Sequence, residues 1–100
     1  MEKGLFNLKD YQVFTFISTS QALKAERVLK NALANFLIIP TPREISTSCG
    51  LAIKIVSADL ASCYDILISN RVEVAAVYHV KMVEGKTRTE RVNTERINNE

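Results

Sequence analysis

The order of strand-like and helix-like segments constrains the fold of this chain more than any other feature. Strand patterns, rich in β-branched and aromatic residues, occupy four segments: 11–17, 36–39, 50–56 and 72–80. Patterns with apolar residues three and four positions apart, as in helices, follow the first and third of these segments. The predicted order is therefore β-α-β-β-α-β.

This order predicts a ferredoxin-like α+β fold. Short connections and right-handed crossovers favour a four-stranded antiparallel sheet with both helices on one face. Residues 11–82 would form this single domain, because 100 residues are enough for one domain and not for two. Residues 1–10 are expected to be an N-terminal extension.

Both helices are expected to begin at a capping serine and to pack through an apolar stripe. Ser18 and Gln21 have the spacing of a capping box, and Ser57 precedes the second helix. The stripe of the first helix comprises Ala22, Ala25, Leu29, Ala32 and Leu33. The stripe of the second comprises Leu60, Cys63, Tyr64 and Leu67. Cys63 is accordingly expected to be a packing residue.

The first strand is apolar on both of its sides. Val13 alternates with Phe14 and Phe16, yet two helices can cover only one face of the sheet. The second face would then meet a partner, which predicts a homodimer or another oligomer.

The polar tail, residues 83–100, has a different composition from the domain. It is rich in Thr, Asn, Glu and Arg, and Val92 and Ile97 are too far apart to make a helix stripe. The tail is therefore predicted to be disordered or loosely helical.

Composition and charge exclude several classes of protein. With 47% apolar and 24% charged residues the chain is globular, and a net charge of +2 without Trp or a basic stripe argues against nucleic acid binding. No apolar run is long enough to span a membrane, and the N-terminus lacks a signal peptide pattern, so we expect a cytoplasmic protein with reduced cysteines. A single His beside two Cys is a poor metal-ligand set, and no cofactor is expected.

Cys49 is the candidate chemical residue. It ends a loop, residues 40–50, that also contains Arg43, Ser46 and Ser48 and that would connect the second and third strands. In the predicted topology this loop lies beside the start of the first helix, where the free amides around Thr19 and Ser20 favour a thiolate. Gly50 would let another group approach the sulfur closely.

The free energy needed to ionise Cys49 shows whether the helix terminus alone could make it a thiolate. A cysteine with a pKa of about 8.5 is only about 3% thiolate at about pH 7, and half ionisation requires about 2 kcal/mol. A helix terminus supplies about 0.3–1 kcal/mol, so Arg43 would have to contribute as well.

Structural interpretations of the same residues remain open. Cys49 can be a small residue that begins a strand, and Arg43 a solvated charge or an anion contact. His79 has no evident partner and is read as a surface or edge residue rather than a general base. The sequence suggests no Ser-His-Asp arrangement, phosphate-binding glycine loop or carboxylate pair.

The residues of this loop also resemble a known family. Pro40-Thr41-Pro42-Arg43, Ile45-Ser46 and Ser48-Cys49-Gly50-Leu51-Ala52, after a helix with Ala22-Leu23-Lys24-Ala25-Glu26, are similar to the putative selenium/sulfur carrier protein-like family of small bacterial domains. The resemblance runs from about Val13 to Tyr78, and Cys49 falls on the cysteine position of the family.

The resemblance implies a relay rather than an enzyme in the strict sense. A donor enzyme would load a persulfide or selenopersulfide onto Cys49, Arg43 and the helix amides would steady its charge, and an acceptor would remove it. Such a carrier needs an exposed sulfur.

Two other classes of function remain open. The domain can be a dimeric sensing module that binds a small ligand at the sheet edge or subunit interface, without thiol chemistry. It can also be an interaction protein that docks through the second sheet face and the polar tail.

Overall fold

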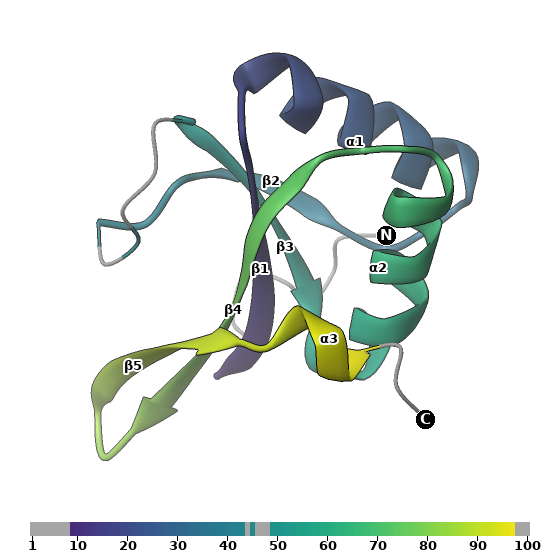
Figure 1. Cartoon of the computed structure of the whole chain (residues 1–100). Helices are drawn as coiled ribbons and strands as arrows, with labels where there is room; N and C mark the ends of the chain where they lie inside the picture. The colour runs from purple at the N-terminus through teal and green to yellow at the C-terminus, as the bar shows by residue number, and fades with distance from the viewer. Residues whose placement is uncertain (1–8, 44, 46–48, 98–100) are drawn as a thin grey trace.

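The computed structural model describes residues 9–43, 45 and 49–97, which are drawn in colour in Figure 1. Within them the chain forms a five-stranded antiparallel sheet in the order β2-β3-β1-β4-β5. The strands are β1 (Asp10–Phe16), β2 (Leu37–Pro40), β3 (Leu51–Val56), β4 (Val74–Val83) and β5 (Lys86–Val92). The helices are α1 (Thr19–Asn31), a single 3-10 turn η1 (Ser57–Asp59), α2 (Leu60–Ser69) and the short α3 (Thr94–Ile97).

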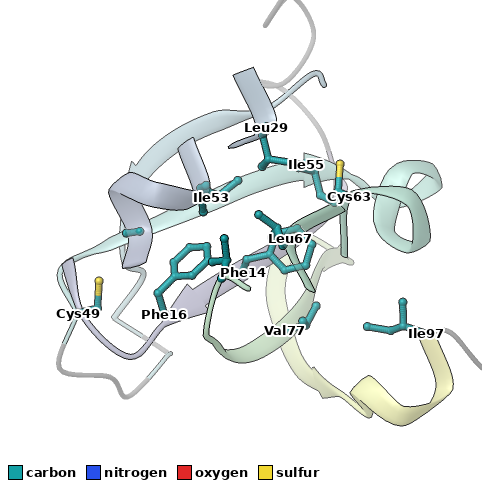
Figure 2. Packing of buried hydrophobic residues seen from close by; sticks show 13 residues of the cluster. Phe14, Phe16, Leu29, Cys49, Ile53, Ile55, Cys63, Leu67, Val77 and Ile97 are labelled. Atoms are coloured by element: carbon teal, nitrogen blue, oxygen red, sulfur yellow. The ribbon is translucent and has the colours of Figure 1, made fainter. Parts of the chain in front are cut away.

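The α+β class is confirmed, with α1 and α2 on the same face of the sheet (Figure 1). Phe14 at the centre of β1 is paired with Ile53 of β3 and Val77 of β4. These three side chains form one cluster with Leu29 of α1 and Leu67 of α2, as Figure 2 shows. The main core therefore lies between the sheet and its two helices.

The start of α1 agrees in part with the predicted capping box. The Ser18 hydroxyl accepts a hydrogen bond from the Gln21 amide at 3.3 Å, so the capping serine is confirmed. The capping box is incomplete. Its second hydrogen bond would run from the Ser18 amide to the Gln21 side chain, but Oε1 of Gln21 instead accepts from the Glu73 amide at 2.8 Å.

The end of α1 differs from the prediction. The helix ends at Asn31, and Leu33 has a left-handed backbone with φ of 59°. The Ala34 amide then donates to the Leu29 carbonyl at 3.0 Å, which closes the last turn. Leu33 is 91% exposed as a result, and Ala32 is also exposed, so neither extends the apolar stripe.

The start of α2 also differs. Ser57 makes no capping hydrogen bond, since its hydroxyl donates to Oδ1 of Asp10. A 3-10 turn precedes the helix instead. The predicted apolar stripe of this helix is confirmed, with Cys63 and Leu67 buried and Leu60 and Tyr64 packed against the same cluster.

A fifth strand replaces the predicted disorder in the polar tail. Strand β4 continues to Val83, and β5 pairs with it from Val83↔Lys86 to Val77↔Val92. The connection has positive φ at both Glu84 (51°) and Gly85 (79°), which is the geometry of a two-residue type I′ hairpin turn. The prediction of four strands therefore does not hold, and the described part of the tail forms β5 and α3 instead of a disordered or loosely helical segment. Residues 98–100 lie outside the described residues.

The centre of the second face of the sheet is buried within the single chain. Val13 and Ala52 are 0% exposed and Val80 is 3% exposed, and Ile45 from the loop between β2 and β3 packs on them. The expectation of an oligomer rested on an exposed apolar face, and these residues do not form one.

Candidate functional site

Cys49 lies at the end of the loop between β2 and β3, and its side chain is buried. Only 2% of the residue is exposed, and it belongs to the main cluster together with Phe16 and Ala22. Its thiol donates a hydrogen bond to the Leu51 carbonyl at 3.3 Å. Figure 2 draws Cys49 at one end of the cluster. The exposed sulfur expected of a carrier is therefore not found in this conformation.

The loop is closed by its own backbone and by Thr41. The Thr41 amide donates to the Gly50 carbonyl at 3.1 Å, and its hydroxyl donates to the Cys49 carbonyl at 2.9 Å. The Ile45 amide donates to the Pro42 carbonyl at 3.0 Å. Thr41 thus fixes the backbone of Cys49, a role that sequence reasoning missed although Thr41 stands between two prolines.

The residues predicted to surround the thiol have separate positions. Thr15 of β1 is paired with Ala52 of β3, so the loop and the start of α1 lie at the same end of the sheet, as predicted. Thr19, Ser20 and Arg43 are exposed, however, whereas Cys49 is buried.

Gly50, Ser46 and Ser48 were also predicted to lie around the Cys49 thiol. A Cβ atom on Gly50 would meet nothing within 4 Å, so no close contact inside the described chain depends on its lack of a side chain. Ser46 and Ser48 lie outside the described residues.

Cys63 is the second free cysteine, and it is chemically unsuited to exchange. It is buried in α2, and this burial, together with the nearby Asp59 carboxylate, raises the pKa of its thiol to about 11. At about pH 7 only about one Cys63 thiol in ten thousand is then ionised. The prediction that Cys63 is a packing residue is confirmed.

A polar cluster that the sequence did not reveal lies where β1 begins. Nε2 of His79 is 2.9 Å from Oδ1 of Asp10, and Ser57 donates to the same oxygen. Nε2 of Gln12 in turn donates to the Ser57 hydroxyl at 3.2 Å, while its buried Oε1 has no hydrogen-bond partner among the described residues. The expectation that His79 lacks a partner is therefore wrong.

This cluster is not a hydrolytic triad. In a triad the histidine lies between the nucleophile and the carboxylate, whereas here the Asp10 carboxylate lies between Ser57 and His79. The hydrogen bonds from Ser57 first and from His79 second lower the pKa of Asp10. The arrangement stabilises the Asp10 carboxylate and leaves Ser57 without a histidine base.

The part of the chain that the structure describes contains no set of metal ligands. No three His, Cys, Asp or Glu residues are grouped there. In the same residues, no helix has the length and apolar character needed to cross a membrane.

Comparison with known families identifies the chain. The family described as Putative Se/S carrier protein-like matches residues 10–79. The protein belongs to this family. The matched region runs from β1 through most of β4 and contains both cysteines, whereas β5 and α3 lie beyond it. No curated protein and no solved structure matches the chain.

Proposed function

We propose that this protein carries sulfur or selenium on Cys49, as a persulfide or selenopersulfide, between a donor enzyme and an acceptor. The family to which it belongs supports the carrier assignment. The observation that selects Cys49 is the contrast between the positions of the two cysteines. Cys63 is held inside a helix with its pKa raised to about 11, whereas Cys49 ends a loop and precedes the exposed Gly50.

The burial of Cys49 makes loop opening part of the proposed cycle. Three hydrogen bonds close the loop around Thr41 and Ile45, and each contributes about 0.5–1.5 kcal/mol. Opening against about 1.5–4.5 kcal/mol in total would suppress spontaneous thiol chemistry by about ten-fold to a thousand-fold or more. A closed loop would therefore shield the loaded group, and contact with a donor or acceptor would open it.

The transfer itself needs no external oxidant or reductant. After its proton has passed to solvent, the Cys49 thiolate attacks the outer sulfur of the donor persulfide. The sulfur–sulfur bond of the donor breaks, the donor thiolate leaves, and Cys49 becomes the persulfide. An acceptor thiolate repeats the same exchange and restores the Cys49 thiolate, and selenium follows the same path in a selenopersulfide. Arg43, exposed on the same loop, would pair with the terminal anion.

Sulfur loading tests this proposal. The protein is incubated with a cysteine desulfurase and cysteine, and mass spectrometry locates the added sulfur. We expect one sulfur on Cys49 and none on Cys63, no loading of Cys49→Ser, and wild-type loading of Cys63→Ser.

A loop variant adds a kinetic arm to the same experiment. Thr41→Val removes one closing hydrogen bond and should load about two- to ten-fold faster, whereas Thr89→Val on β5 should not change the rate. Sulfur on Cys63 alone, or loading that persists in Cys49→Ser, would contradict the proposal.

We also propose that residues 11–82 form a ferredoxin-like unit to which β5 has been added. The strand order β2-β3-β1-β4, with α1 and α2 packed on one face, supports this assignment.

A further inference from the structure

Two large apolar side chains are exposed near the buried thiol of Cys49. Ile17 is 53% exposed and Leu23 is 47% exposed. Each directly follows a residue of the main cluster, since Ile17 comes after Phe16 and Leu23 comes after Ala22. Cys49 belongs to the same cluster, and Figure 2 shows it beside Phe16. The two exposed side chains therefore lie at the end of the sheet that holds the Cys49 loop.

The hydrogen bonds of α1 show how the helix is turned relative to this loop. Oε1 of Gln21 accepts from the Glu73 amide, and Nζ of Lys24 donates to the Arg71 carbonyl at 3.2 Å. This side of α1 therefore faces the segment that joins α2 to β4. The strand order places β4 on one side of β1 and β3 on the other, and β3 follows the Cys49 loop. The opposite side of α1 is therefore turned toward the loop.

Leu23 lies on this opposite side of α1. It follows Gln21 by two positions, which places it about 200° further round the helix. Thr19, Leu23 and Arg27 are spaced four residues apart, so they form one row along the helix. All three are exposed. An apolar and a basic side chain thus border the loop from the helix.

These residues form a surface that is both apolar and positively charged. We define the docking surface as Ile17, Leu23, Arg27 and Arg43, which are all exposed. Neither arginine takes part in an ion pair with any residue that the structure describes. Helix α1 as a whole carries three basic residues and one acidic residue. The charge of this surface therefore favours a negatively charged partner.

We propose that the docking surface binds the protein that supplies sulfur to Cys49, and that this donor surrounds its reactive thiol with apolar and acidic side chains. The inference rests on the proposed function, because a buried thiol requires a partner to open its loop. Leu23 and Ile17 give the donor two apolar contacts, and the arginines pair with its carboxylates. A donor that contacts both Leu23 on the helix and Arg43 on the loop bears directly on the segment that closes over Cys49.

The experiment loads the full chain from two sulfur sources, a cysteine desulfurase with cysteine and glutathione persulfide. The exchange on Cys49 is the same in both cases, with the glutathione thiolate leaving in the second. Leu23→Ala should lower kcat/KM for loading from the desulfurase by about five-fold or more, and should leave loading from glutathione persulfide unchanged. Leu33→Ala is the matched control, because Leu33 is 91% exposed beyond the other end of α1. It should load from both sources as the wild type does.

A charge reversal tests the acidic character of the donor. Arg27→Glu should lower kcat/KM with the desulfurase by about ten-fold, and added salt should slow the wild type toward the rate of this variant. Arg88→Glu, on the exposed face of the distant strand β5, should not change the rate.

Two results would overturn the docking inference. One is that Leu23→Ala and Arg27→Glu both load from the desulfurase as fast as the wild type. The other is that both variants slow equally with glutathione persulfide, because the substitutions would then act on the loop or the fold and not on a protein contact. If the wild type gained no sulfur on Cys49 from either source, the proposed function itself would be contradicted.

Discussion

Truncation of Ile97 tests whether the last turn of the described chain is part of the core. Ile97 is 7% exposed and packs in the cluster that contains Phe14, Leu67 and Val77. Replacing a buried Ile by Ala costs about 2–5 kcal/mol, because apolar burial is lost and a cavity remains. Helix α3 is a single turn that can move to fill part of the cavity, so we expect Ile97→Ala to cost about 2 kcal/mol.

The control removes the same atoms from an exposed position. Ile68 on α2 is 43% exposed, so Ile68→Ala loses less burial and leaves no enclosed cavity. Both residues lie in helices, where Ala is the better helix former, so this propensity effect has the same sign in the two variants. We expect Ile68→Ala to change the free energy of unfolding by less than about 0.5 kcal/mol.

Urea unfolding followed by far-ultraviolet circular dichroism measures both variants, since the chain has no Trp for fluorescence. For a domain of this size, about 2 kcal/mol also lowers Tm by about 8–16 °C. If Ile97→Ala and Ile68→Ala were equally stable, α3 would not be docked on the main core.

Two further predictions concern a carboxylate and a backbone angle. The lowered pKa of Asp10 means that its hydrogen bonds with Ser57 and His79 stabilise the fold above the unfolded-state pKa of about 3.9, and that this stabilisation fades below it. The cost of Asp10→Asn, measured by urea unfolding, should therefore shrink between about pH 5 and about pH 3, and a constant cost would contradict the assignment. Leu33→Gly should raise the free energy of unfolding by about 0.5–1 kcal/mol, because φ is 59° and the exposed side chain loses no packing. Leu23→Gly within α1 should instead lower it by about 1 kcal/mol, and a loss of stability in both variants would refute the strain argument.

The parts of the fold that sequence predicted depend on neighbours along the chain. Ser18 caps α1 through an amide three positions away, and Phe14 and Phe16 face the helices because side chains alternate along a strand. Ser57 resembled a cap equally well, but its hydroxyl donates to Asp10, which is 47 positions away. No local pattern reports such a partner.

The polar tail was misjudged for a related reason. Val92 and Ile97 made no stripe because they belong to different elements, the end of β5 and α3. Each becomes useful only against residues of the earlier chain, such as Val77, which is paired with Val92. An average over the composition of this segment therefore hid two separate contacts with the core.

The burial of Cys49 could have been found in the sequence. Continuing the alternation of β3 by one step places Cys49 on the same side as Leu51, Ile53 and Ile55, all of which belong to or pack against the main core. The composition of the loop suggested a reactive sulfur, whereas the alternation of β3 predicted that the Cys49 side chain points into the core. The hydrogen bonds of Thr41 could not be predicted, since they depend on the path of the loop.

The fifth strand changes which strand forms this edge of the sheet. Without it, the outermost strand would be β4, whose apolar stretch would present bare peptide groups for pairing with a neighbouring polypeptide. Strand β5 occupies that position with exposed Lys86, Arg88 and Glu90. Charged side chains on an edge strand oppose its pairing with the edge of another sheet, so β5 disfavours edge-to-edge aggregation.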